Sequence, residues 1–114
     1  MSVVSVYALF ADAAEAERIG RTMIDERLAA CVNIFGPVHS IYRWKGATET
    51  ADEVAAIFKT SDERVAALMA RIAELHSYDV PCVAAWPVDK LLGAYADWVE
   101  DSVSATAATG ASDP

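Results

Sequence analysis

The stretch CVNIFGPVHSIYRWKGATETADEVAAIFKT, residues 31–60, decides the fold because it is rich in β-branched and aromatic residues and has no helical periodicity. It predicts two strands. A kink or bulge is expected near Gly36-Pro37, and the turn between the strands is expected at Gly46-Ala47. Each arm of this hairpin is expected to run for about ten residues or more, longer than the usual five or six.

The segments on either side of the hairpin show other patterns. Residues 3–10 are nearly all apolar, which predicts a buried strand, and residues 82–88 predict a short strand that ends near Pro87. Apolar residues at helical spacing predict three amphipathic helices, which extend from Ala16 to Leu28, from Val65 to Leu75 and from Leu91 to Val103.

The predicted element order is β-α-β-β-α-β-α. Capping-box patterns at Asp12 to Glu15 and at Thr60 to Glu63 predict the starts of the first two helices. The first six elements match the ferredoxin-like βαββαβ arrangement of the α+β class, in which helices cover one face of an antiparallel sheet. We therefore expect one domain over residues 1–103 with an extra C-terminal helix, and a disordered tail over residues 104–114.

The predicted length of the hairpin leaves strand edges that the rest of the chain cannot cover. A single chain of 114 residues cannot cover both edges of so long a hairpin, and long apolar edges are prone to aggregate unless they are paired. Pairing with other copies of the chain in a closed symmetric ring would protect these edges. The sequence therefore predicts a homo-oligomer.

Composition and charge exclude several classes of partner. The chain has 9 basic and 17 acidic residues and a formal net charge of −8, which disfavours nucleic acid and anionic membrane surfaces as partners. No basic segment typical of a secretory signal precedes the first apolar stretch, and no apolar run is long enough to cross a bilayer. The chain has two cysteines, too few for a disulfide framework, so we expect a cytoplasmic protein with reduced, buried thiols.

His76 and Cys82 form the best metal-ligand pair by residue type, because imidazole and thiolate both suit copper and zinc. Six residues separate them across a predicted helix-to-strand break, so the sequence leaves open whether they converge. A hydrogen-bonding histidine at a helix end and an inert thiol form the structural alternative. Two ligands alone do not make a tight metal site.

Two further groups suggest other chemistry. Cys31 and His39 could form a nucleophile and base pair, although the apolar strand around Cys31 favours a structural thiol. Two acidic clusters suit hard cations, but they match no calcium-loop spacing and are typical of solvated faces: Glu49, Asp52 and Glu53, and Asp97, Glu100 and Asp101.

Three segments, in this order, resemble the CutA family of divalent-cation-tolerance proteins. They are residues 26–34 (ERLAACVNI), residues 40–46 (SIYRWKG) followed by Glu53 and Lys59-Thr60, and residues 76–81 (HSYDVP) followed by Tyr95 and Trp98. The resemblance covers the chain from Val3 to about Val103. It implies a tight cytoplasmic homotrimer of ferredoxin-like protomers, related to the trimeric PII-type signalling proteins. It also implies tolerance of copper and other divalent metals, with no catalytic mechanism.

The chain departs from the family pattern at the proposed copper ligands. Some members have a cysteine in the first strand and two adjacent histidines at the end of the second helix. Here Ala8 and Leu75 occupy two of these positions, and His76 alone matches. Cys82 stands where the family commonly has a glutamate. No cofactor is therefore certain, and Cu(II) or another divalent cation is the ligand that the resemblance implies.

The resemblance also implies contacts between subunits. Aromatic residues near the strands would pack at a subunit interface or line a pocket between protomers, with Lys59 and His76 as its polar elements. Glu53 and Lys59 would join an intersubunit ion-pair network. The residues expected at this intersubunit pocket or interface are Cys31, Tyr42, Trp44, Glu53, Lys59, Tyr78, Asp79 and Trp86.

The sequence thus favours a non-enzymatic CutA-like homotrimer that works in the response to divalent metal ions. The alternative is a PII-like sensor of a small effector that acts through a protein partner, although no glycine-rich phosphate loop supports nucleotide binding. A third hypothesis is an enzyme that uses Cys31 or His76 in a cleft between subunits.

Overall fold

The computed structural model describes residues 2–104, and these form one four-stranded sheet with three helices. The expected disordered tail lies, apart from Ser104, outside the described residues. In chain order the elements are β1 (Val3–Phe10), α1 (Ala13–Asp25), β2 (Cys31–Trp44), β3 (Ala47–Ser61), α2 (Val65–Leu75), β4 (Val83–Pro87) and α3 (Gly93–Val103). The strand order is β2-β3-β1-β4, and every neighbouring pair is antiparallel. The predicted ferredoxin-like α+β fold with a long hairpin and a C-terminal helix is confirmed.

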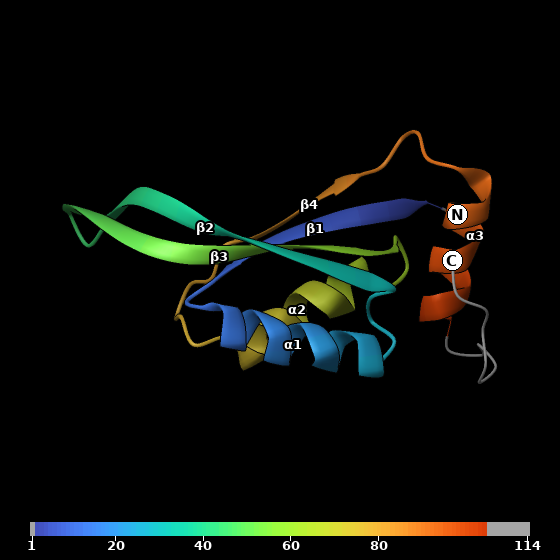
Figure 1. The fold of residues 1–114 in the computed structure, drawn as a ribbon, viewed down its shortest axis with the longest axis horizontal. Helices are drawn as coiled ribbons and strands as arrows, with labels where there is room; N and C mark the ends of the chain where they lie inside the picture. The colour runs from blue at the N-terminus through green and yellow to red at the C-terminus, as the bar shows by residue number, and fades with distance from the viewer. Residues whose placement is uncertain (1, 105–114) are drawn as a thin grey trace.

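Helices α1 and α2 lie side by side against one face of the sheet (Figure 1). Strand β1 sends alternate side chains, Val4, Val6, Ala8 and Phe10, into this layer, where all four are buried. They pack with the following buried residues of β3 and of the two helices: Ala56, Phe58, Ala16, Ile19, Met23, Leu68 and Ile72. This layer is the main core of the protomer. Among the described residues, no helix is both long and apolar enough to cross a bilayer.

Helix α3 closes one end of the sheet rather than one of its faces (Figure 1). Val99 and Val103 are buried against Val3 and Ala30 in a second, smaller core. The Arg64 guanidinium donates to the carbonyl oxygen of Val103 at 2.8 Å, which places a cation at the C-terminal end of this helix. The apolar face predicted from Leu91 onward is thus confirmed for the helix itself, but Leu92 precedes it and is exposed.

The hairpin has arms of 14 and 15 residues, as its sequence predicts. The register shifts between Phe35 and Val38, where two residues oppose one of β3, so the predicted bulge at Gly36-Pro37 is confirmed. The turn lies at Lys45-Gly46, one residue before the predicted position, and both residues have positive φ, 49° and 82°. Positive φ at both central residues matches the twist of a two-residue hairpin, and glycine adopts it without a steric penalty.

One of the two predicted capping boxes is wrong. At α1 the Asp12 carboxylate accepts from the Glu15 N–H at 2.8 Å, and the Glu15 carboxylate accepts in turn from the Ala11 N–H at 3.0 Å. At α2 the residue before the helix is Arg64, and no side chain caps it. Thr60 belongs to β3 instead, and its hydroxyl donates to the Leu28 carbonyl at 2.7 Å.

The hairpin extends well beyond the rest of the sheet. Strand β1 pairs with β3 from residue 54 onward, so residues 38–53 form a two-stranded ribbon that projects past the helices (Figure 1). The molecule is accordingly 48 Å long but only 26 and 22 Å across. An isolated two-stranded ribbon is marginally stable in water. The ribbon therefore needs contacts that a single protomer does not supply along its length.

Candidate functional site

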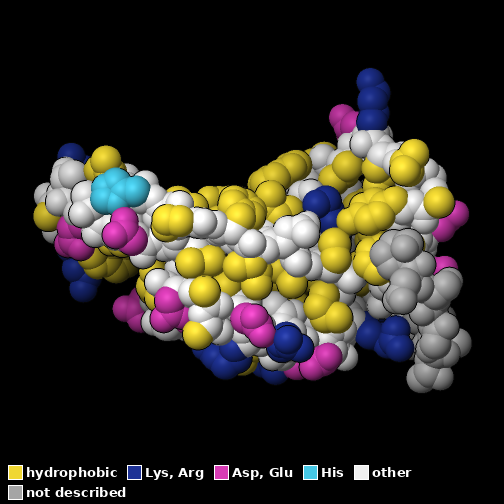
Figure 2. All heavy atoms as spheres, viewed as in Figure 1, with side chains coloured by type: hydrophobic (Ala, Val, Ile, Leu, Met, Phe, Trp, Pro, Cys, Tyr) yellow, Lys and Arg dark blue, Asp and Glu magenta, His cyan; other side chains and the backbone are white. Residues whose placement is uncertain are grey.

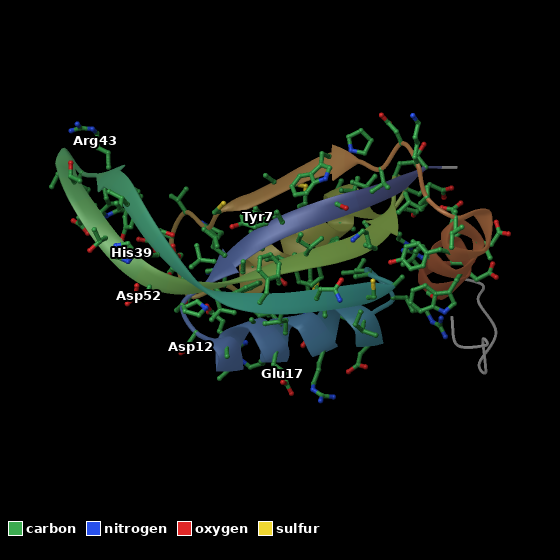
Figure 3. The ribbon with its side chains drawn as sticks, turned by 45° about the horizontal axis from the view of Figure 1, so that its top comes forward. Tyr7, Asp12, Glu17, His39, Arg43 and Asp52 are labelled. Carbon is green, nitrogen blue, oxygen red and sulfur yellow. The ribbon has the colours of Figure 1, made fainter. Side chains whose placement is uncertain are left out.

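The sheet face turned away from α1 and α2, here called the open face, carries apolar side chains. By register it includes Tyr7 of β1, Phe35 of β2, Ile57 of β3 and Trp86 of β4. Phe35 and Trp86 are 44% and 45% exposed, and Tyr7 lies in the middle of this face (Figure 3). A solvated face of an antiparallel sheet normally carries polar side chains, so this face has the composition of one that becomes covered.

Figure 2 shows hydrophobic side chains gathered along the strands between the ribbon and α3, whereas charged side chains concentrate on the helices below. The open face continues from the sheet onto the ribbon, because Val38 opposes Glu53 and Tyr42 opposes Glu49 on the two arms. One continuous surface therefore runs from β4 to the hairpin tip.

A cavity of about 770 Å³ lies where this surface meets the loop of residues 78–82, between α2 and β4. Ribbon residues form one wall and the 78–82 loop forms the other. The residues that line the cavity are Leu9, Ser40, Ile41, Tyr42, Trp44, Glu49, Glu53, Tyr78, Asp79, Val80, Pro81 and Cys82. The volume falls within the roughly 300–1,000 Å³ typical of small-molecule sites.

Glu53 and Tyr78 join the two walls of this cavity. The Tyr78 hydroxyl donates to Glu53 Oε2 at 3.0 Å, and Glu53 is only 7% exposed. Burial and the hydrogen bond to Glu53 raise the pKa of Tyr78 to about 12. The tyrosine thus stays a neutral donor to the carboxylate at physiological pH.

Cys82 is exposed at the cavity and Cys31 is only half-buried, so the expectation that both thiols are buried is wrong. Partial burial, and then the negative charge of Glu53, raise the pKa of the Cys82 thiol above the ordinary value. The pKa of Tyr7 is also raised, first by burial and then by the charges of Cys82 and Glu53. Glu53 thus governs the electrostatics of this part of the open face, and it disfavours further negative charge there.

His76 has a structural environment. Its Nε2 lies 2.7 Å from the Leu9 carbonyl oxygen, and its Nδ1 accepts from the Tyr78 N–H at 3.0 Å. The ring is 9% exposed and stacks on Phe10, with centroids 5.1 Å apart. Because both ring nitrogens are engaged, His76 would have to give up a hydrogen bond to ligate a metal ion.

The described residues do not assemble a metal centre. Within residues 2–104 no three His, Cys, Asp or Glu side chains converge in a way that could hold a metal ion. Cys82 lines the cavity, whereas His76 is bound to β1 and to the start of the 78–82 loop. A soft metal also needs the thiolate form of cysteine, which the raised pKa of Cys82 disfavours. A copper centre therefore does not fit the side chains of one protomer.

The eight predicted interface residues fall into two groups. Tyr42, Trp44, Glu53, Tyr78 and Asp79 all line the cavity. The other three, Cys31, Lys59 and Trp86, lie on the open face away from it, where Cys31 opposes Lys59 across the β2–β3 ladder. No ion pair involves Lys59 or Glu53 among residues 2–104.

The proposed pairing of Cys31 with His39 is wrong. The Cys31 sulfur lies 3.3 Å from the Tyr95 hydroxyl, and burial and this contact raise the pKa of Tyr95 to about 12. His39 lies on the ribbon, where its Nδ1 is 2.8 Å from the Asp52 carboxylate (Figure 3). Eight residues of extended strand separate the two side chains by about 26 Å.

The fold divides the first of the two acidic clusters predicted from the sequence and keeps the second together on α3. Glu49 and Glu53 line the cavity, whereas Asp52 pairs with His39 outside it. Near α3, Glu100 Oε1 is buried without a partner among the described residues. Burial and the charges of Asp62, Glu63 and Asp97 raise the pKa of Glu100, so its surroundings disfavour a negative charge and do not form a prepared cation site.

Glu15 holds the chain just after α2, a role that the sequence does not reveal. Besides the Ala11 N–H, its carboxylate accepts from the Ser77 N–H at 2.9 Å, 62 residues away in the chain. Burial opposes ionisation, but the hydrogen bonds from Ser77 and Ala11 prevail and lower the pKa of Glu15. The capping-box pattern is the only sequence signal at this residue.

Comparisons with known proteins agree with this arrangement. The family model described as CutA1 divalent ion tolerance protein matches residues 4–102. The divalent-cation tolerance protein CutA of Archaeoglobus fulgidus is 42% identical over 89 residues, which are 78% of this chain and 86% of that protein. The corresponding protein of Thermotoga maritima is 37% identical over 101 residues, 89% of this chain and 99% of that protein.

Solved structures match over nearly the whole described chain. CutA from Xylella fastidiosa superimposes with a TM-score of 0.88 at 34% identity, covering 91% of this chain and 100% of that one. A structure described as the periplasmic divalent cation tolerance protein CutA of Archaeoglobus fulgidus gives a TM-score of 0.86 at 37% identity, covering 90% and 99%.

Proposed function

The chain belongs to the CutA1 divalent ion tolerance protein family, and from this premise we propose that it acts in the response to divalent metal ions as a cytoplasmic homotrimer. The observation that carries the assembly is the open face with its continuation on the ribbon. Phe35, Trp86 and Tyr42 are 44%, 45% and 40% exposed in one protomer, and among residues 2–104 no strand pairs with the outer edge of β2.

Other copies of the chain are the occupant that fits this surface. The ribbon offers unpaired backbone on both of its arms, which favours extension of the sheet by a second chain. Three copies arranged around an axis would bury their open faces against each other and close the ring without free apolar edges. Lys59 and Glu53, which form no ion pair within residues 2–104, would then meet charges of a neighbouring protomer.

The proposed role does not depend on catalysis. The matched family is described by divalent ion tolerance and not by a reaction, and Cys31 and His39 lie too far apart to act as a pair. We propose the cytoplasm because both cysteines are free, as expected in a reducing compartment. One relative is described as periplasmic, so cell fractionation is the experiment that tests the proposed cytoplasmic location.

Copper is the ligand that the family resemblance implies, and His76 with Cys82 is the hypothesis to test. Demetallated protein would be titrated with Cu(II) and Zn(II), next to His76→Ala and Cys82→Ser. Because no three ligands converge within residues 2–104, we expect no tight site and equal heats for all three proteins. Stoichiometric binding that is lost in either variant would instead support a copper site, with further ligands from another protomer.

Loss of the chain tests the tolerance role in the cell. Deletion should lower the Cu(II) concentration that arrests growth, and wild-type chain should restore it. Phe35→Glu should fail to restore tolerance because it places a charge on the open face, whereas Ala14→Glu, at an exposed position of α1, should restore it. Unchanged growth of the deletion strain in Cu(II), Zn(II) and Co(II) would contradict the proposed role.

A second candidate function is favoured by the cavity at the 78–82 loop. A site of about 770 Å³ with aromatic and acidic walls has the size of an effector pocket. The chain would then sense a small molecule, as PII-type proteins do, and pass the signal to a protein partner. Ligand-dependent thermal stabilisation would support this function through mass action.

A further inference from the structure

We propose that the sheet continues from one copy of the chain into the next, because the free edge of β4 pairs with the free edge of β2 in a neighbouring copy. This pairing rests on the proposed homotrimer and adds which strands meet, in which direction and in which register. Within residues 2–104, β2 and β4 are the outermost strands of the sheet, so no strand pairs with their outer edges. A closed ring needs two such surfaces, which differ from each other and fit together.

The two edges share a composition that is unusual for free edges. Strand β4 covers Val83–Pro87 (VAAWP), and the part of β2 before the bulge covers residues 31–35 (CVNIF). Each stretch has five residues and no charged side chain. Natural sheets commonly protect a free edge with charged residues, so two uncharged edges of equal length indicate strands that are paired. The bulge at Gly36-Pro37 limits the pairing to this first part of β2.

The direction of the pairing follows from the symmetry of three copies. Neighbours in the order β2-β3-β1-β4 are antiparallel, so β2 and β4 run in opposite directions within one protomer. Parallel pairing between copies would require neighbouring protomers to point in opposite directions. A rotation by one third of a turn cannot reverse a direction, so a ring of three copies excludes parallel pairing. The strands of neighbouring copies therefore pair antiparallel, and all protomers point the same way.

Hydrogen bonds to β1 show which backbone groups of β4 are free. The Cys82 carbonyl accepts from β1 at 3.2 Å, and the Val88 N–H donates to β1 at 3.0 Å. Because successive residues of a strand turn their backbone groups to opposite sides, Val83 and Ala85 present an N–H and a C=O each at the outer edge. Their side chains lie on the helix side of the sheet, because both residues oppose buried core residues of β1.

The faces of the two strands limit the register. Directly opposite residues of an antiparallel pair have their side chains on one face, and on β2 Val32 and Ile34 lie on the helix side, where they line a groove with residues of α1. Val32 can therefore lie opposite Ala85 or opposite Pro87 of the neighbouring copy. Pro87 has no N–H to donate. Only the register that places Val32 opposite Ala85, and Ile34 opposite Val83, forms every hydrogen bond between the edges.

This register also covers apolar surface that one protomer leaves open. A groove of about 310 Å³ lies on the helix side of β2, and its apolar part includes Ile24 and Ile34, which are 36% and 39% exposed. Val83 and Ala85 of the neighbouring copy would lie over this groove. Beyond the bulge, the same direction carries the ribbon across the loop of residues 78–82 of the neighbouring copy. The ribbon thereby gains the contacts that its own protomer does not supply.

Cysteine pairs placed across the junction test the pairing in the full chain. Asn33 and Ala84 would lie opposite each other on the open face, whereas three strand spacings, about 14 Å, separate β2 from β4 within one protomer. A disulfide cannot span that distance. Asn33→Cys with Ala84→Cys, in a Cys31→Ser and Cys82→Ser background, should therefore form bonds between chains on mild oxidation. We expect a covalent species of three 12.2 kDa chains, 36.6 kDa in all, on a non-reducing denaturing gel.

Asn33→Cys with Trp86→Cys, in the same background, is the matched control, because it moves the second thiol two residues along the same face. It should cross-link at least tenfold more slowly. Faster cross-linking of this control would overturn the register. No cross-link in either variant, while sedimentation still shows three chains, would overturn the pairing and leave the proposed homotrimer in place. A monomer in sedimentation would remove both.

Amide hydrogen exchange of the wild-type chain tests the same pairing without a substitution, and it decides alone if the cysteine variants do not fold. The N–H groups of Val83 and Ala85 are at a free edge in one protomer. In the assembled protein they should exchange at least tenfold more slowly than the amides of an unpaired strand edge. Exchange of both groups at the rate of an unpaired edge, in protein that sediments as three chains, would overturn the pairing.

Discussion

Replacement of His76 by alanine should destabilise the protein without removing a metal site. The ring is 9% exposed, its Nε2 is 2.7 Å from the Leu9 carbonyl oxygen, and its Nδ1 accepts from the Tyr78 N–H at 3.0 Å. Its loss leaves both backbone groups without these partners and removes the contact with Phe10. Two buried hydrogen bonds at about 1 kcal/mol each, with about 1 kcal/mol for lost packing, give about 3 kcal/mol per protomer.

Urea unfolding measures this loss. With an m-value of about 1.5 kcal/mol/M, the midpoint should fall by about 2 M. The second histidine of the chain is a matched control, because His39 is exposed on the ribbon and its pair with Asp52 contributes about 0–1 kcal/mol. Wild type, His76→Ala and His39→Ala must be compared at one protein concentration, since unfolding of an oligomer depends on concentration.

Two results would refute this reasoning about His76. A midpoint for His76→Ala equal to that of His39→Ala would show that the buried hydrogen bonds contribute little. An unchanged midpoint together with lost Cu(II) binding would show that His76 is a metal ligand and not a structural residue.

Three further predictions concern a buried carboxylate, a turn and a thiol. Glu15→Gln should lower the free energy of unfolding by about 1–2 kcal/mol at neutral pH. The difference in stability from wild type should narrow below about pH 4, because a lowered pKa in the folded state gives stability that is lost as the pH falls through that pKa. Equal urea midpoints at pH 7 would contradict this prediction. Gly46→Ala should cost about 1 kcal/mol in thermal unfolding because φ is 82°, and Gly93→Ala, where nothing crowds an added Cβ, should cost less. The rate of alkylation of Cys82, measured by peptide mass spectrometry, should rise only above the ordinary pKa of a thiol. Glu53→Gln should move this pH–rate profile to lower pH, because it removes the negative charge near the thiol. A pH–rate profile that Glu53→Gln leaves unchanged would exclude an effect of the Glu53 charge on Cys82.

Local patterns in the sequence predict much of the fold. The apolar run at residues 3–10 gives the bounds of β1, and the absence of helical periodicity over residues 31–60 gives the hairpin and its bulge. The capping box at Asp12 is confirmed because the partner lies three residues away. The same pattern at Thr60 fails because its hydroxyl finds an acceptor 32 residues away, at Leu28. Tertiary hydrogen bonds can thus override a local signal.

The site is less predictable than the fold, because it depends on where the ribbon passes. Residue types and family motifs are enough to select Tyr42, Trp44, Glu53 and Tyr78, but no spacing shows that the ribbon and the 78–82 loop enclose a cavity. Nor does the sequence show that both ring nitrogens of His76 are engaged. These features arise from contacts between segments that are far apart in the chain. The periodicity of a sequence predicts local structure and does not predict such contacts.

Sedimentation equilibrium at micromolar protein concentration tests the central claim most directly, namely that the open face and the ribbon are covered by other copies of the chain. One protomer has a mass of 12.2 kDa, so the account predicts a single species of three times that mass, 36.6 kDa. It also predicts that Phe35→Glu shifts the distribution toward smaller species. A wild-type chain that sediments as a stable 12.2 kDa monomer at this concentration would contradict the account.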